Sequence, residues 1–160
     1  MRSETEANRA IEKYSDMVYR LCIIHLKNRF DAEDIFQTVF LKYILSSVSF
    51  ESEEHEKAWL IRITLNACKD VLKNYFRSHT VSLNSVTEQC SHLSEASREV
   101  LNAVLTLPEK YRDIVYLHYY EGYTVPETAK ILNKNPNTIY THLTRSKKLL
   151  KEKLGDDIDE

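Results

Sequence analysis

The side chains best suited to bind nucleic acid gather near the end of the chain. Between residues 134 and 153, six Lys or Arg side chains are opposed by a single acid, Glu152. The six are Lys134, Arg145, Lys147, Lys148, Lys151 and Lys153. Because the whole chain carries a formal net charge of -2, this local excess of positive charge indicates a defined docking face for DNA rather than a generally basic binder.

A second set of cations lies within residues 62–73. Arg62, Asn66, Lys69 and Lys73 are spaced so that one stripe of a helix would carry all four. Trp59 lies near the start of the same stretch. Cations can bind phosphates and flat rings can stack on unpaired bases, so the pattern fits single-stranded nucleic acid. A solvated helix face above a core tryptophan explains the same residues equally well.

Local signals predict the two helices that would position the first basic set. Thr124 and Glu127 form a T-x-x-E capping box, which marks the start of a helix. Asn133 stands where that helix must end, because asparagine tolerates the left-handed conformation. Asn135 then caps a second helix, and Pro136 suits its first position. The layout predicts a helix-turn-helix whose second helix enters the DNA major groove. An ordinary amphipathic helical hairpin is the alternative.

Apolar residues at helical spacing predict the buried faces of these helices and of three earlier ones. The earlier helices are expected at about residues 7–27, from near residue 31, and at about residues 56–75. Their expected buried residues are Ile11, Tyr14, Val18, Leu21 and His25 or Leu26, then Ile35, Val39 and Tyr43, then Leu60, Ile63, Ala67 and Val71. In the helix-turn-helix they are Val125, Ala129, Leu132, Ile139, Leu143, Leu150 and Leu154.

Length and composition bound the architecture. The 160 residues include only two glycines and three prolines, and strand-like alternation is scarce, so an all-α protein is expected. Residues 78–97 are rich in Ser and Thr without periodicity, which predicts a flexible linker that is long for a loop within one domain. We therefore expect two small helical domains, residues 1–77 and 98–160, with the helix-turn-helix in the second.

Several classes of function find no support in the sequence. Cys22, Cys68 and Cys90 are widely spaced and lack the paired ligands of a zinc site. They suit a reducing cytoplasm. The polar N-terminus and the lack of a long apolar run argue against a signal peptide or a membrane span. No nucleophile–base spacing and no glycine-rich phosphate loop stand out, so we expect neither an enzyme nor a bound cofactor or metal.

Three segments resemble one family of bacterial transcription proteins. Extracytoplasmic-function (ECF) sigma factors carry a clamp-binding motif similar to DAEDIFQTVFLKYI, residues 31–44. Their promoter-melting helix is similar to KAWLIRITLNACKDVLKN, residues 57–74, and their C-terminal helix-turn-helix domain to residues 107–154. The resemblance covers nearly the whole chain in the family's order. It implies a protein that binds core RNA polymerase and directs promoter recognition and melting, with an anti-sigma factor as a further partner.

The resemblance also implies roles for particular residues. Polymerase binding falls on Asp31, Asp34, Gln37 and Phe40. Reading of the melted minus-ten element falls on Trp59, Arg62, Asn66, Lys69 and Lys73, with the loop at about residues 46–55. Reading of the duplex minus-thirty-five element falls on Asn137, Thr138, Tyr140 and Thr141 for base sequence, and on Arg145, Lys147 and Lys148 for phosphates.

Some residues depart from the family's pattern. Thr38 stands where Glu is usual, Leu65 replaces a frequent Arg, and Tyr140 and His142 occupy positions that are commonly basic. The loop before the melting helix is acidic, so its Glu side chains are expected to point away from phosphates or to accept hydrogen bonds from bases. The alternative function is a helix-turn-helix regulator that binds duplex DNA without joining polymerase, which would leave the motif at residues 31–37 idle.

Overall fold

The computed structural model describes residues 1–74 and 95–155. The chain divides into two units, Met1–Val81 and Ser82–Glu160. Every element assigned within the described residues is helical, which confirms the expected all-α class. Most of the predicted linker, residues 78–94, lies outside the described residues, whereas residues 95–97 belong to a helix.

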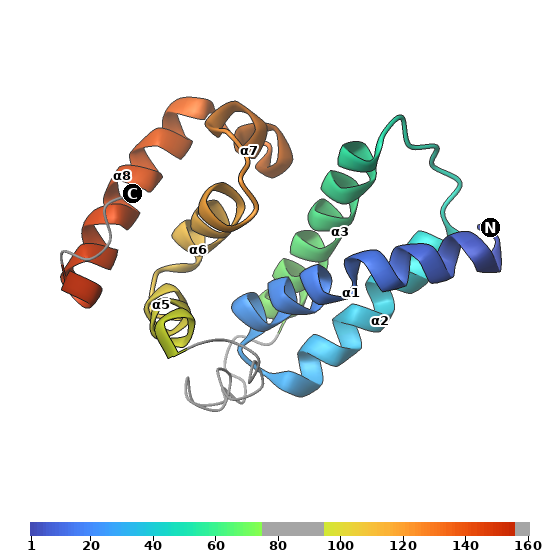
Figure 1. Ribbon diagram of the computed structural model, residues 1–160, viewed down its shortest axis with the longest axis horizontal. Helices are drawn as coiled ribbons and strands as arrows, with labels where there is room; N and C mark the ends of the chain where they lie inside the picture. Colours follow the sequence, from blue (N-terminus) through green and yellow to red (C-terminus); the bar gives the residue numbers. More distant parts are fainter. Residues whose placement is uncertain (75–94, 156–160) are drawn as a thin grey trace. The chain divides into compact units, whose positions relative to one another are not determined.

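The described part of the N-terminal unit consists of α1 (Glu4–Leu26), α2 (Arg29–Leu45) and α3 (Glu53–Asn74), and α1 packs against both other helices (Figure 1). A capping box between Ser3 and Glu6 begins α1. Lys27 ends α1 in the left-handed conformation with φ 54°, and the side chain of Asn28 caps α2 immediately afterwards. The short turn folds α2 back along α1, so that the Arg2 amide donates to the Ile44 carbonyl.

Apolar side chains from all three helices form the core of this unit. The largest fully buried ones are Val18, Leu21, Ile23, Val39, Tyr43, Leu60 and Ile61. His25 is also 2% exposed, as the helical spacing predicted. Cys22 and Cys68 are fully buried, and neither forms a disulfide bond. The core therefore holds α2 and α3 in fixed positions on α1, with their outer faces left to solvent.

The structure corrects two expectations for α3. The helix begins three residues before the predicted start, because the Ser52 hydroxyl accepts a hydrogen bond from the His55 amide and caps it. Its buried stripe is also rotated from the predicted one. Ile63 and Val71 are only half-buried, and Ile61 and Leu65 are buried instead, at 0% and 2% exposure. Among the residues predicted to be buried in α1, Ile11 is half-buried.

The described part of the C-terminal unit consists of α5 (Glu95–Leu105), α6 (Glu109–Val115), the π-helical turn η1 (Tyr116–Tyr120), α7 (Val125–Leu132) and α8 (Pro136–Leu154) (Figure 1). The long α8 packs against α5, α6 and α7. One cluster of buried side chains surrounds Leu107, Tyr111 and Leu150, and another surrounds Ile114 and Ile139. No helix in the described ranges is both long and apolar enough to cross a membrane.

The helix-turn-helix signals are confirmed by the geometry of α7 and α8. The Glu127 amide donates to Thr124 Oγ1 at 3.2 Å, and the Thr124 amide donates to Glu127 Oε1 at 2.9 Å. Asn133 adopts the left-handed conformation with φ 56° and ends α7. The side chain of Asn135 accepts from the Asn137 amide at 2.8 Å and begins α8, with Pro136 in its first turn. These local contacts fix how α8 projects from the unit.

Candidate polymerase and promoter interfaces

The solvent-facing side of α8 carries the side chains that the resemblance assigns to the minus-thirty-five element. Ile139, Leu143 and Leu150 are buried in the unit, so residues between them in the helical repeat face away from it. The exposed residues are Asn137, Tyr140, Thr141, Arg145, Lys147 and Lys148, and Thr138 is half-buried. Tyr140 is 60% exposed. The first two turns thus present amide, hydroxyl and aromatic groups, and the later turns present cations.

His142 points in the opposite direction. Its ring packs edge-on against Tyr111, with 5.2 Å between ring centroids, and the side chain is half-buried. Burial lowers the pKa of His142 below its ordinary value of 6.5, and the nearby positive charges of Lys110, Lys134 and Arg145 lower it further. Although His142 occupies a position that is commonly basic in the family, its ring packs α8 against α6.

The outer face of α2 carries the residues that the resemblance assigns to polymerase. Asp34 and Gln37 are exposed, and Asp31 is half-buried. Phe40 is 4% exposed and packs against Phe36, with 5.0 Å between ring centroids. Phe40 is therefore a buried residue of α2, whereas Asp34 and Gln37 lie on its exposed surface.

Three apolar side chains on α2 are exposed, and the sequence reasoning gave no role to two of them, Phe30 and Leu45. Phe30, Leu41 and Leu45 are 75%, 56% and 59% exposed. With Asp34 and Gln37 they follow the helical repeat at intervals of three or four residues, so the five share one face, which we call the α2 stripe. The signal was available, because the apolar residues at positions 30, 41 and 45 fall out of register with the buried set of Ile35, Val39 and Tyr43.

A separate stripe runs along α3. Arg62, Asn66 and Lys73 are exposed, and Trp59 and Lys69 are half-buried. Intervals of three and four residues place these five on one helical face, which we call the α3 stripe. It carries three cations on one side of the helix, at the spacing that the sequence predicted. Trp59 also contacts the core of the unit, so it is not a freely exposed stacking ring.

Two of the four glutamates at residues 51–56, Glu53 and Glu56, pair with basic side chains of α1. Glu56 is 4% exposed, and its Oε2 accepts hydrogen bonds from Tyr43 at 2.6 Å and from Arg9 at 2.8 Å. Glu53 forms an ion pair with Lys13. These contacts agree with the expectation that such carboxylates turn away from DNA phosphates.

The network around Glu56 shifts the pKa of its members. Burial alone would raise the pKa of Glu56, but hydrogen bonds from Tyr43 and Arg9 outweigh it, so the pKa lies below the ordinary value of 4.5. Burial and the hydrogen bond to Glu56 raise the pKa of Tyr43 to about 12. Glu56 is therefore charged at neutral pH, and it ties α3 to both α1 and α2.

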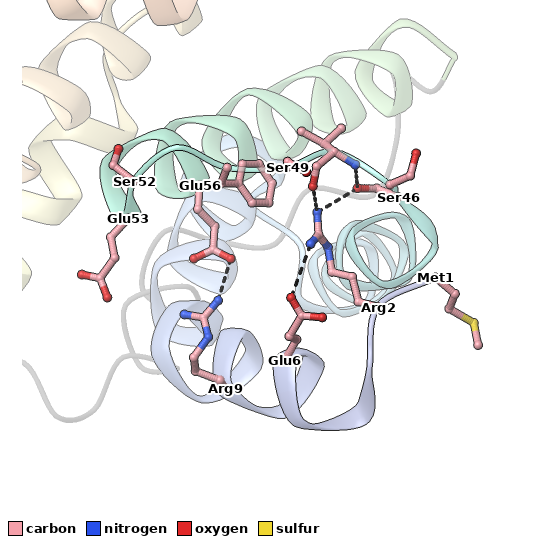
Figure 2. A pocket seen from close by; sticks show the side chains of 12 residues that line it. Met1, Arg2, Glu6, Arg9, Ser46, Ser49, Ser52, Glu53 and Glu56 are labelled. Carbon is pink, nitrogen blue, oxygen red and sulfur yellow. Dashed lines mark hydrogen bonds and ion pairs between the residues drawn. The ribbon is translucent and has the colours of Figure 1, made fainter.

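The loop at residues 46–52 joins α2 to α3, and an aromatic cluster holds it. Phe50 stacks in parallel with Tyr43 at 6.2 Å between ring centroids, and it meets Trp59 edge-on at 5.6 Å and His55 edge-on at 5.3 Å. Beside the loop lies a hollow of about 660 Å³. Figure 2 shows it between the start of α1, with Arg2, Glu6 and Arg9, and the loop serines, with Glu53 and Glu56 at its far side.

Comparison with known families identifies the chain. The model described as Sigma-70 region 2 matches residues 10–79, and the model described as Sigma-70, region 4 matches residues 97–150. The two matches lie one in each structural unit. The chain belongs to the ECF family of RNA polymerase sigma factors.

Two sigma factors of Bacillus subtilis and two solved structures are similar to this chain over more than four fifths of their own length. The ECF RNA polymerase sigma factor SigW of Bacillus subtilis is 27% identical to this chain, and the similarity covers 91% of this chain and 87% of the length of SigW. RNA polymerase sigma factor SigV of the same organism is 28% identical over 85% of this chain and 83% of its own. The structure of the sigma factor RpoE from Bartonella quintana, solved with the anti-sigma factor NepR, is 18% identical, covers 94% of this chain and 98% of its own, and has a TM-score of 0.73. CnrH, solved with the cytosolic domain of CnrY, is 17% identical, covers 98% of this chain and 92% of its own, and has a TM-score of 0.70.

Membership settles the broad function. This sigma factor is a non-catalytic subunit that binds core RNA polymerase and directs it to promoters. The region 2 model spans residues 31–37, the motif that the regulator hypothesis would leave idle. Within the described residues, no group of three His, Cys, Asp or Glu side chains is placed to hold a metal ion.

The structure explains two departures from the family's pattern. The Thr38 hydroxyl donates to the Asp34 carbonyl at 3.0 Å, so it serves its own helix and adds no charge to the α2 stripe. Leu65 is 2% exposed, so its place in α3 is a core position, where an uncharged side chain packs without desolvation cost.

Proposed function

We propose that the N-terminal unit of this sigma factor binds polymerase and melted promoter DNA at the same time, through two different helices. The observation that carries the proposal is the existence of two exposed stripes with different chemistry. The α2 stripe combines acidic, amide and apolar groups, whereas the α3 stripe is cationic. Because the stripes belong to separate helices, each offers its own surface to a different partner.

Polymerase docking uses the α2 stripe. Asp34 and Gln37 supply an acceptor and an amide at the centre of the stripe, and exposed apolar residues flank them on both sides. Such a surface fits a partner with cations opposite Asp34 and apolar side chains around them, since buried apolar area and matched charge act together in specific interfaces. Asp31 lies at the edge of this surface, and Phe40 contributes from the core side of α2, where it is buried.

Capture of the melted minus-ten element uses the α3 stripe and the 46–52 loop. Arg62, Lys69 and Lys73 bind phosphates, Asn66 can donate to or accept from a base edge, and Trp59 lies where the stripe meets the loop. Holding unpaired bases recovers part of the stacking energy that promoter opening costs. Melting is therefore driven by binding energy.

Reading of the minus-thirty-five element uses α8. Its exposed early residues lie where a recognition helix meets base edges, and its later cations lie where they reach phosphates. Two DNA-reading units on one chain raise each other's effective concentration at a promoter that carries both elements.

The chain also has features suited to regulation by a protein partner. The RpoE structure from Bartonella quintana contains an anti-sigma factor, and we extend this kind of partner to the present sigma factor. The exposed apolar residues of the α2 stripe are a surface that such a partner would cover. The place of action is the cytoplasm, where core polymerase and promoter DNA are found.

Run-off transcription with core polymerase tests the docking assignment. Asp34→Lys with Gln37→Ala is expected to abolish co-purification with core polymerase and to remove promoter-specific transcripts, while the helical content measured by circular dichroism stays unchanged. Lys42→Glu is the matched control, because Lys42 is an exposed charged residue of α2 outside the stripe. Normal polymerase binding by the double variant would show that the α2 stripe is not the docking surface.

A further inference from the structure

The 46–52 loop is an irregular segment with few hydrogen bonds of its own. The Val48 amide donates to Ser46 Oγ at 3.3 Å, and the Glu51 amide donates to His55 Nδ1 at 3.2 Å. Four of the seven residues are serines, which add little apolar contact. A segment of this kind needs contacts from elsewhere in the chain to adopt one conformation.

Arg2 supplies such contacts from the other end of the unit's sequence. Its Nε donates to the Tyr43 carbonyl at 3.0 Å, and its Nη2 donates to Ser46 Oγ at 3.2 Å and to the Val48 carbonyl. Its guanidinium carbon lies 4.5 Å from the centre of the Tyr43 ring and 4.8 Å from that of Phe50. A single planar group thus contacts both the backbone of the loop and the ring that anchors it.

The position of Arg2 is itself determined by the start of α1. Its amide donates to the Ile44 carbonyl at 2.8 Å, and its Nη1 lies 3.8 Å from Glu6 Oε1. Glu6 is held in turn by the capping box with Ser3. The Arg2 side chain is 10% exposed, so these contacts are largely shielded from water. Figure 2 shows the Arg2 head group between Glu6 and Ser46.

We infer that Arg2 is a positioning residue for promoter opening, which fixes the conformation of the 46–52 loop before DNA arrives. The guanidinium closes one side of the hollow beside the loop and sets where the loop carbonyls and serine hydroxyls point. The inference rests on the proposed role of this loop in capturing the minus-ten strand. A preordered loop binds the strand without the loss of entropy that ordering it would require.

The first test measures loop order in the free, full-length protein. Arg2→Ala is expected to raise the hydrogen-exchange rates of the Val48 and Glu51 amides by about tenfold. It is also expected to increase acrylamide quenching of Trp59, the only tryptophan of the chain, which contacts Phe50. Lys42→Ala is the control, since it removes an exposed cation of α2. Unchanged exchange and quenching in Arg2→Ala would overturn the inference.

Arg2→Lys separates the shape of the side chain from its charge. Lysine keeps the positive charge but lacks the planar fork that serves two rings and three acceptors at once, so its loop is expected to exchange as fast as that of Arg2→Ala. Full restoration of slow exchange by lysine would overturn the assigned role of the guanidinium. Circular dichroism verifies that both variants keep the wild-type helical content, which is expected because Ser3 still caps α1.

The second test measures DNA binding by the holoenzyme. Arg2→Ala is expected to weaken binding of a single-stranded minus-ten oligonucleotide about tenfold and to flatten its dependence on base substitutions, with minus-thirty-five duplex binding unchanged. Equal weakening on both DNAs would overturn the positioning role, because it indicates general destabilisation. If Arg2→Ala loosens the loop but oligonucleotide binding stays normal, the loop does not capture the strand. That result would refute the proposed role of the loop in minus-ten capture, although Arg2 would still be shown to order the loop.

Discussion

Replacement of Glu56 by glutamine tests whether the buried carboxylate holds the N-terminal unit together. The change preserves the shape of the side chain and removes its charge, so both hydrogen bonds to Oε2 become bonds to a neutral acceptor. Hydrogen bonds to charged groups contribute about 1.5–3 kcal/mol each, against about 0.5–1.5 kcal/mol for neutral ones. The Arg9 side chain is 46% exposed, so its share is screened by water, and we expect a total loss of about 1.5–2 kcal/mol in the free energy of unfolding.

Urea denaturation followed by Trp59 fluorescence measures this loss in the N-terminal unit alone, since the chain has no other tryptophan. With a denaturant dependence of about 1 kcal/mol per molar urea for a unit of this size, the midpoint is expected to fall by about 1.5–2 M. Glu54→Gln is the matched control, because Glu54 is a neighbouring exposed carboxylate of α3. Equal midpoints for Glu56→Gln and Glu54→Gln would refute the stabilising role of the network.

The pH dependence of the same urea denaturation tests the role of the Glu56 charge independently. The folded-state pKa of Glu56 lies below its ordinary value of 4.5, so the native state binds fewer protons than the unfolded state in that interval. Stability therefore rises with pH in that interval. The contribution of Glu56 to the free energy of unfolding is fully present above about pH 4.5 and is lost as pH falls through the folded-state pKa. The difference between wild type and Glu56→Gln is expected to be constant near neutrality and to shrink below pH 4.5. A difference that grows on acidification would contradict this assignment.

Three further predictions concern DNA. Lys69→Ala with Lys73→Ala is expected to reduce permanganate reactivity of unpaired promoter thymines more than initial promoter binding; wild-type reactivity would mark the α3 stripe as a solvated face only. Tyr140→Ala is expected to reduce discrimination within the minus-thirty-five element by about 1–3 kcal/mol, whereas Lys148→Ala is expected to weaken all duplexes evenly and to lower the salt dependence by about one unit of slope. Titration of promoter and scrambled duplexes at several salt concentrations separates the two, and equal weakening of both duplexes by Tyr140→Ala would show that this side chain does not face the bases.

Features set by neighbouring residues could be predicted from the sequence. The capping box of Thr124 and Glu127 and the cap at Asn135 depend on contacts within three residues, and the helical repeat of the α3 stripe depends on α3 alone. For this reason the helix-turn-helix and the cationic face were accessible without a structure.

Features set by distant residues could not be predicted. Apolar side chains occupy adjoining stripes of α3, and only the packing of α1 and α2 decides that Ile61 and Leu65 are buried while Ile63 is half-buried. Arg2 contacts residues more than forty positions away, and a polar N-terminal segment carries no periodic signal of such a role. His142 occupies a commonly basic position, and its inward direction follows from Tyr111 on another helix.

The two buried thiols of the N-terminal unit make the transient opening of its helices measurable. Cys22 on α1 and Cys68 on α3 are both 0% exposed, and a thiol enclosed in a packed core is inert because reagents cannot reach it. An alkylating agent or oxidant meets these atoms only when α1 and α3 separate. Their rate of modification in a Cys90→Ser background therefore counts the openings of the unit, and it would register whether a bound partner closes the helices more tightly.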